Sequence, residues 1–143
     1  MSEMARPDID TLAAGQALPT REFRPDTIQL FLYNAALWNA HKIHFDYPYA
    51  RDAEGYPGLV MAGPLLGDWL HQCVVEWLGE HGRLVEIEYS NRRAAFIGDT
   101  LRSTGRILAV DRERGQVSIE VAILNQNDEV LAPGTAVASL RRD

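Results

Sequence analysis

Two histidines three residues apart, His41 and His44, could move protons or bind a metal ion. An imidazole titrates near neutral pH, so a histidine beside a water-excluding aromatic loop can act as a general base and then return the proton. The H-x-x-H spacing supports a metal site only weakly, because no third strong ligand stands at a fixed distance from the pair. Acid–base chemistry is the better interpretation, and two histidines satisfied by hydrogen bonds in a loop are the alternative.

Gly63 is the second candidate for chemistry, because it directly precedes Pro64 at the start of a helical pattern. A glycine there lets a ligand approach the backbone, and free N–H groups together with the helix dipole favour a developing oxyanion. The alternative is that Gly63 only ends the preceding loop and caps the helix. Arg92 and Arg93 could meet a phosphate, or they could belong to a solvated surface.

A helix over residues 64–78 must position Gly63. Apolar residues recur there at i, i+1, i+4 and i+5 and form one broad stripe, with Asp68, Gln72 and Glu76 opposite and His71 on the polar side. Cys73 falls on the stripe and is expected in the core. The stripe consists of Leu65, Leu66, Trp69, Leu70, Cys73, Val74, Trp77 and Leu78.

After this helix the apolar residues alternate with a period of two, which predicts strands. Val85, Ile87 and Tyr89 alternate with glutamates, residues 117–123 alternate in the same way, and residues 100–110 and 130–140 form further strands. Residues 111–115 and 125–128 are the predicted hairpin turns, and Pro133-Gly134 predicts a bulge or bend. An antiparallel sheet wrapped around one long helix, an α+β arrangement, fits this order.

Two earlier segments are less clearly defined. Residues 27–37 could be a strand followed by a bend or a short helix, since periodicity does not separate the two. Residues 39–63 form a long aromatic stretch with two prolines. Such a loop in a compact domain is usually functional or disordered, and the aromatic content favours the functional interpretation. Residues 1–20 are predicted to be an irregular arm and residues 21–143 the single folded domain.

Composition narrows the function classes. The 143 residues carry a net charge of −6, which argues against nucleic-acid or anionic-membrane partners. One cysteine forms no internal disulfide, and one cysteine with four histidines leaves little room for a structural zinc site, so no metal is expected. The chain has no run of about 20 apolar residues and no signal-peptide pattern, so we expect a cytoplasmic protein.

Several segments together resemble the MaoC-like hot-dog dehydratases, nearest the branch that contains itaconyl-CoA and mesaconyl-C4-CoA hydratases and the type 2 3-hydroxyacyl-thioester dehydratases. The resemblance runs from about residue 21 to the C-terminus and is most specific over residues 33–65. The residues that carry it are Tyr33-Asn34-Ala35-Ala36-Leu37-Trp38-Asn39-Ala40-His41-Lys42-Ile43-His44-Phe45-Asp46, Tyr49-Ala50 and Gly55-Tyr56-Pro57-Gly58-Leu59-Val60-Met61-Ala62-Gly63-Pro64-Leu65.

The resemblance implies a hot-dog domain with the long helix inside the curled sheet, and it implies site residues. His44 takes the place of the catalytic histidine and Gly63 that of the oxyanion-hole glycine. Asn39 stands where the broad motif D-x-N-P-x-H has aspartate; an amide cannot act as a base, so it would hold water or substrate. Ala62 replaces a histidine that many relatives carry. The predicted substrate-binding residues are His41, Pro64, Leu65, Tyr56 and Arg93.

The function that the resemblance implies is reversible hydration of an α,β-unsaturated acyl thioester, or dehydration of a 3-hydroxyacyl thioester. The acyl-CoA could be a short dicarboxylic one such as itaconyl- or mesaconyl-CoA, and no cofactor is expected besides the CoA of the substrate. A lone hot-dog sheet leaves an edge uncovered, so we expect a homodimer or a heterodimer with another hot-dog chain. The alternative is a non-catalytic hot-dog subunit that binds acyl thioesters or completes a partner's site.

Overall fold

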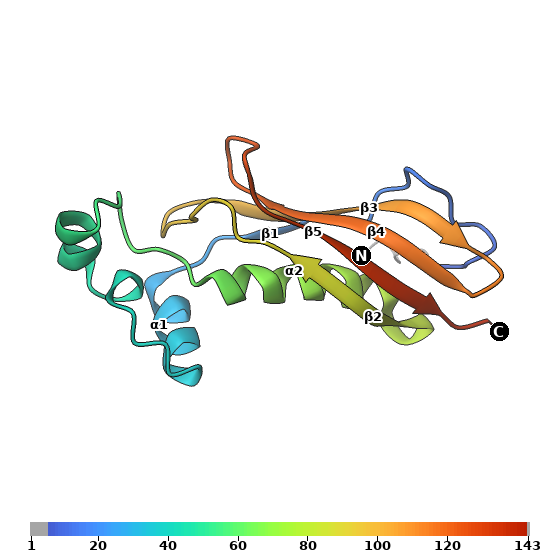
Figure 1. The fold of residues 1–143 in the computed structure, drawn as a ribbon, viewed down its shortest axis with the longest axis horizontal. Coiled ribbons are helices and arrows are strands. Elements are labelled where there is room, and N and C mark those ends of the chain that lie inside the picture. The colour runs from blue at the N-terminus through green and yellow to red at the C-terminus, as the bar shows by residue number, and fades with distance from the viewer. Residues whose placement is uncertain (1–5, 143) are drawn as a thin grey trace.

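A computed structural model describes residues 6–142 (Figure 1). A five-stranded antiparallel sheet covers one long helix, α2 (Gly63–Leu78). The strands are β1 (Arg21–Phe23), β2 (Gly82–Tyr89), β3 (Leu101–Asp111), β4 (Gln116–Leu124) and β5 (Val130–Leu140), in the spatial order β1-β3-β4-β5-β2. This is the α+β hot-dog arrangement that the sequence predicts, so the fold prediction is confirmed.

The apolar stripe of α2 provides one half of the core. All eight predicted stripe residues are buried, and His71 on the opposite side is exposed. The helix contacts β2, β3, β4 and β5, whose inward residues include Ile107, Ile119 and Ile123. Burying a large aliphatic side chain stabilises a fold by roughly 1.5–3 kcal/mol, so this layer contact is the main source of stability.

Strand β4 follows the predicted alternation along its whole length. Val117, Ile119, Val121 and Ile123 of β4 are all buried, while the residues between them are partly or fully exposed. The predicted hairpin turns join β3 to β4 and β4 to β5. The sheet therefore presents one apolar face to α2 and its other face to solvent.

Two details of the sheet differ from the sequence prediction. The register of β2 shifts between Leu84 and Glu86, so Leu84 packs against the core and Val85 is exposed; one extra residue in a bulge changes the face that follows. The ladder runs without a shift through Pro133 and Gly134, and the irregularity of β5 lies opposite Ile123 and Leu124 instead.

Residues 27–37, which could have been strand or helix, form the helix α1 (Thr27–Ala36). The Asp26 side chain accepts a hydrogen bond from the Gln29 N–H and caps the first turn. Residues 39–62 then fold into short turns, including a 3₁₀ turn η1 (Lys42–His44) and a π-helical turn η2 (Tyr49–Ala53). Together with α1 they lie beyond the N-terminal end of α2, at the left of Figure 1.

Residues 6–20 run along β3 at the other end of the sheet. The Leu18 N–H donates to the Gly105 carbonyl, and Ile9, Leu12 and Leu18 are buried in the same core as α2. These residues form no helix, so the segment is irregular in shape although it packs closely. None of the helices formed by residues 6–142 is long and apolar enough to cross a membrane.

Candidate functional site

A cavity of about 260 Å³ opens at the N-terminal end of α2. It is enclosed by the η1 turn, by residues 60–63 and by the loop that follows β2. Three of the predicted site residues, His44, Gly63 and Arg93, line this cavity together. The remaining lining residues are Ile43, Val60, Met61, Leu66, Asn91, Arg92, Ala94 and Ala95.

His44 is the buried imidazole of this cavity, with 7% of its surface exposed. Its Nδ1 lies 2.6 Å from the carbonyl oxygen of Val60, and the Val60 N–H donates back to the Ile43 carbonyl. Because a carbonyl oxygen only accepts, Nδ1 must carry the hydrogen. In the neutral ring the lone pair is then on Nε2, the atom that a general base needs.

Gly63 is the first residue of α2, and its N–H has no hydrogen-bond partner within residues 6–142. Pro64 has no N–H and its side chain is exposed, while the Leu65 N–H donates to the Ala62 carbonyl and the Leu65 side chain is buried in the core. Gly63 therefore offers the accessible donor among these three residues. Neither Pro64 nor Leu65 lines the His44 cavity, and their predicted contact with substrate stays a prediction.

Asn39 and His41 shape the turn that carries His44. The Asn39 Oδ1 accepts a hydrogen bond from the His41 N–H at 3.2 Å, and the His41 Nδ1 accepts one from the Ile43 N–H at 3.3 Å. His41 is thus the side-chain cap of η1, and its ring centre lies 5.9 Å from that of His44. Neither residue lines the His44 cavity.

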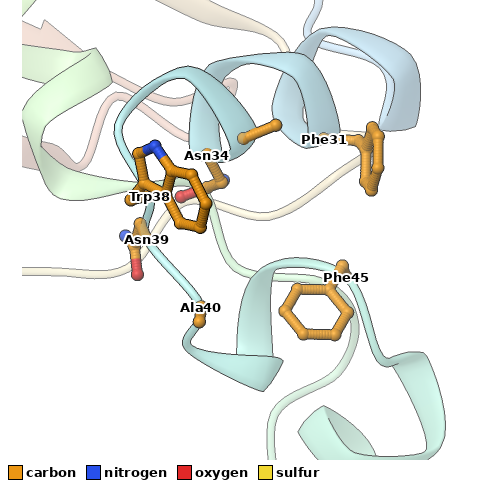
Figure 2. Close-up of a pocket in the computed structure, with 7 residues that line it drawn as sticks. Phe31, Asn34, Trp38, Asn39, Ala40 and Phe45 are labelled. Carbon is orange, nitrogen blue, oxygen red and sulfur yellow. The ribbon is translucent and has the colours of Figure 1, made fainter.

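Asn39 instead lines an apolar hollow of about 370 Å³ beside α1 (Figure 2). Trp38, at 93% exposure, and Phe31 and Phe45 stand around it. Asn34, at its base, is only 4% exposed; its Nδ2 donates to the Leu30 carbonyl, and its Oδ1 has no partner within the described residues. This hollow was not predicted from the sequence.

Tyr56 also lies apart from the His44 cavity. Its ring centre is 5.9 Å from that of Phe96, and its N–H donates to the Ala50 carbonyl. The aromatic contact joins the long loop to the segment after β2, where Val60 and Phe96 form an isolated antiparallel bridge. The role of Tyr56 in binding substrate stays a prediction.

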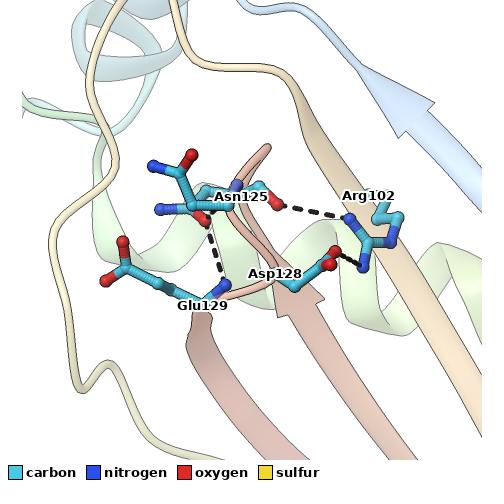
Figure 3. A network of polar contacts seen from close by, with 5 residues as sticks. Arg102, Asn125, Asp128 and Glu129 are labelled. Carbon is cyan, nitrogen blue, oxygen red and sulfur yellow. Dashed lines mark hydrogen bonds and ion pairs between the residues drawn. The ribbon is translucent and has the colours of Figure 1, made fainter.

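Arg93 lies on the cavity wall and forms an ion pair with Glu129 at 2.7 Å. Glu129 belongs to the turn between β4 and β5, where the Asn125 Oδ1 accepts the N–H groups of Asn127 and Glu129 (Figure 3). Arg102 pairs with Asp128 of the same turn but does not line the cavity. The turn thus holds two arginines by two neighbouring carboxylates, and only Arg93 reaches the candidate site.

Asn91 is the polar cavity residue that sequence reasoning missed. It is an isolated amide in a loop without periodicity, so no sequence pattern singles it out. Its side chain packs against Gly63, where a Cβ would lie 2.5 Å from the Asn91 Nδ2. As for metal ions, residues 6–142 contain no group of three or more His, Cys, Asp or Glu side chains able to hold one.

The family model for hydroxyacyl-thioester dehydratase type 2 matches residues 3–97, more than half of the chain. The chain belongs to this dehydratase family. The match covers α1, the whole candidate cavity and the first two strands, and it supports the resemblance to MaoC-like dehydratases drawn from residues 33–65.

One curated relative shares sequence with part of this chain, and two solved structures share its fold. A mesaconyl-C(4)-CoA hydratase of Chloroflexus aurantiacus is 55% identical over 47 residues, 33% of this chain but only 17% of that protein. The (R)-hydratase of A. caviae involved in PHA biosynthesis superposes with a TM-score of 0.83 at 18% identity, covering 92% of this chain and 98% of that one. A MaoC-like dehydratase superposes with a TM-score of 0.85 at 19% identity, covering 95% of this chain and 43% of that one.

Proposed function

We propose that this family member catalyses the reversible hydration of an α,β-unsaturated acyl thioester, or equally the dehydration of a 3-hydroxyacyl thioester. The observation that carries the proposal is that one cavity is lined by two suitable groups. One is the buried imidazole of His44, whose neutral ring has its lone pair on Nε2, and the other is the helix-start N–H of Gly63, which has no hydrogen-bond partner within residues 6–142. These are the base and the oxyanion donor that chemistry next to a thioester carbonyl needs.

The two groups divide the reaction between them. In dehydration, His44 Nε2 removes the α-proton, and the electrons of the C–H bond form an enolate whose oxygen accepts a hydrogen bond from the Gly63 N–H. The enolate then collapses to the C=C bond while the bond to the 3-hydroxyl breaks, and that hydroxyl takes the proton from His44 and leaves as water. Hydration is the reverse sequence. Asn39 does not line this cavity, so a role in positioning water or substrate stays the sequence prediction, while its hydrogen bond from the His41 N–H supports the turn that carries His44.

The substrate of this proposal is an acyl-CoA, and no cofactor is required besides that CoA. Proton transfer and oxyanion stabilisation are both supplied by the chain itself. The mesaconyl-C(4)-CoA hydratase relative favours a short dicarboxylic acyl group, such as an itaconyl or mesaconyl group. Arg93 at the cavity wall offers a cation for an anionic part of such a substrate. A cytoplasmic location stays a prediction.

Assembly with a second hot-dog unit is part of the proposal. The outer face of α1 and the residues after it expose Ile28, Phe31, Leu32, Leu37 and Trp38, each more than half exposed. Several large apolar side chains exposed on one short segment are typical of a protein interface. A copy of this chain is the proposed partner, and a different hot-dog chain is the alternative. Sedimentation of wild type against Trp38→Ser with Phe31→Ser tests it, because the variant should sediment as a smaller species.

A panel of enoyl-CoA and 3-hydroxyacyl-CoA thioesters, followed by absorbance of the conjugated thioester, tests the activity. His44→Ala should lower kcat/KM by about 10²–10⁴-fold without loss of the fold. His71→Ala, an exposed histidine on the far side of α2, is the matched control and should behave as wild type. Equal rates for His44→Ala and wild type would exclude His44 as the base.

The second candidate function is a non-catalytic subunit that binds thioesters or completes a partner's site. Asn39 and Ala62 favour it, because an amide and a methyl group stand where many relatives carry ionisable side chains. An isolated chain that binds the thioester but is inert until a second hot-dog chain is added would establish this function instead.

A further inference from the structure

Next to the Gly63 N–H, the cavity contains a second group that can donate hydrogen bonds. The Asn91 side chain is so close to Gly63 that a Cβ on this glycine would lie 2.5 Å from its Nδ2 and 3.0 Å from its Cγ. Both residues line the His44 cavity. Gly63 is therefore a glycine because the Asn91 amide occupies the volume that a larger residue would need.

The two donors are both unused. Within residues 6–142, neither the Gly63 N–H nor the Asn91 side-chain amide makes a hydrogen bond. The carboxamide carries two N–H bonds, and an oxygen with developing negative charge is the ligand that such donors favour. An amide that served only as packing against an α-carbon could be replaced by an apolar group without loss.

The backbone on both sides of Asn91 is fixed. The Ser90 N–H donates to the Pro133 carbonyl at 3.1 Å, and the Arg92 and Arg93 N–H groups both donate to the Leu131 carbonyl, at 2.9 and 3.2 Å. Further along, the Met61 N–H donates to the Ala95 carbonyl at 2.8 Å and joins this loop to the segment before α2. These bonds hold Asn91 over the helix start, and donors fixed before the reaction are the effective ones in an oxyanion hole.

From these observations we infer that Asn91 is a catalytic residue, whose side-chain N–H donates the second hydrogen bond to the thioester oxygen beside that of Gly63. The inference rests on the proposed function and deepens it, since it completes a two-donor oxyanion hole. The negative charge on the oxygen grows from the bound thioester to the enolate. The Asn91 hydrogen bond therefore strengthens in the transition state and acts mainly on kcat.

The variants Asn91→Ala and Asn91→Asp test this role. Asn91→Ala removes the donor, and Asn91→Asp keeps the shape but replaces the N–H bonds by acceptors. Removal of one oxyanion-hole donor typically costs about 10²–10³-fold in kcat, so we expect a loss of that size for both variants, with KM for Asn91→Ala within about threefold of wild type. Wild-type kcat in Asn91→Ala would overturn the inference.

Asn127→Asp is the matched control, because it makes the same charge change at an exposed asparagine that does not line the His44 cavity. It should retain wild-type kcat. Gly63→Ala provides an independent check, since its Cβ must displace the Asn91 amide. If the two residues act on one oxygen, the double variant Gly63→Ala/Asn91→Ala should lose less than the product of the single losses, and fully multiplicative losses would contradict a shared role.

A spectroscopic readout separates this inference from the proposed function. Hydrogen bonds to the thioester oxygen polarise the conjugated system, so bound enoyl-CoA should absorb at a longer wavelength than free enoyl-CoA, and Asn91→Ala should reduce that shift. A wild-type protein that binds enoyl-CoA with the shift but without turnover would refute the hydratase proposal and leave Asn91 as an oxyanion donor. An undiminished shift in Asn91→Ala would refute the role of Asn91 even in an active enzyme.

Discussion

His44 and Val60 are joined by a hydrogen bond of 2.6 Å from the imidazole Nδ1 to the backbone carbonyl. This bond selects one ring tautomer and leaves the lone pair of the neutral ring on Nε2, and His44 lines the cavity. The N–H of the same Val60 donates to the Ile43 carbonyl, so the η1 turn and residue 60 are held by bonds in both directions. The orientation of the proposed base therefore depends on backbone atoms, and it is sensitive to the turn in which His44 stands.

The first prediction concerns Asn39, whose Oδ1 accepts the His41 N–H in that turn. Asn39→Asp keeps this acceptor and Asn39→Ala removes it. If Asn39 acts by holding the turn, Asn39→Asp should retain activity within about threefold, while Asn39→Ala should lose at least about tenfold in kcat/KM, the equivalent of a lost hydrogen bond of about 1.4 kcal/mol.

The opposite result has a clear meaning. If Asn39→Asp and Asn39→Ala lose activity equally, the amide N–H groups of Asn39 are what the reaction needs, and Asn39 contacts water or substrate directly. Steady-state kinetics with one enoyl-CoA substrate distinguishes the two, with circular dichroism as the check that both variants fold.

The sequence predicted the features that depend on a regular spacing of apolar residues within one element or on a short motif. The stripe of α2 and the alternation of β4 were predictable, because a buried face repeats along a single element. His44 and Gly63 were identified as candidates from two separate segments, the histidine pair and the Gly63-Pro64 helix start, and they do line one cavity. The helix α1 could not be separated from a strand by periodicity, and the Asp26 cap at its start is the local signal that could have decided it.

Other features depend on contacts between distant segments and left no local signal. Asn91 stands over Gly63 only because its neighbours bond to β5, about 40 residues away along the chain. Val85 is exposed because of a bulge in the pairing of β2 with β5. The separation of Asn39 from the His44 cavity follows from how residues 39–62 fold in three dimensions, and the motif spacing does not contain that information.

The second prediction concerns the ion pair between Arg93 and Glu129, which is largely exposed. An exposed ion pair of this kind stabilises a protein by only about 0–1 kcal/mol. An anionic group of the substrate can therefore displace Glu129 from Arg93. Glu129→Gln should lower KM for acyl-CoA by about two- to fivefold, and Arg93→Met should raise it by about five- to tenfold, with kcat little changed in both. Two comparisons identify which anionic group of the substrate contacts Arg93. CoA against dephospho-CoA thioesters tests a phosphate of CoA, and dicarboxylic against monocarboxylic acyl groups tests a carboxylate of the acyl chain.

Asp128→Asn is the control for this pair, because Asp128 holds Arg102 from the same turn and Arg102 does not line the cavity. It should leave KM unchanged. If Glu129→Gln and Asp128→Asn instead raise KM by the same factor, the turn affects binding only through its structure. Competition between Glu129 and the substrate for Arg93 would then be refuted.

The third prediction concerns Gly134 in β5. A Cβ there would lie 2.3 Å from the backbone carbonyl oxygen of Glu88, and a backbone atom in a sheet cannot move aside cheaply. Gly134→Ala should lower the free energy of unfolding by about 1–3 kcal/mol. Gly58→Ala is the comparison, since its Cβ would meet only Tyr47 at an ordinary 3.9 Å. Urea denaturation measures both, and equal stability of the two variants would contradict the prediction.

The last prediction concerns pH and the hydrogen bond of 2.8 Å from the Tyr33 hydroxyl to Asp68, which joins α1 to α2. Burial, followed by the bond to Asp68 and the charge of its carboxylate, raises the pKa of Tyr33. The folded state therefore holds this proton more tightly than the unfolded chain does. The contribution of the Tyr33 hydroxyl to the free energy of unfolding is complete below about pH 10, the ordinary tyrosine pKa, and is lost as the pH rises above it. Urea unfolding at pH 8 and pH 10.5 should show a smaller alkaline loss of stability in Tyr33→Phe than in wild type, and a deficit of about 1 kcal/mol for Tyr33→Phe at pH 8. Tyr56→Phe is the control, because the Tyr56 hydroxyl makes no hydrogen bond within residues 6–142, and it should follow the wild-type curve. If Tyr33→Phe loses as much stability at alkaline pH as wild type does, Tyr33 is not the source of that loss.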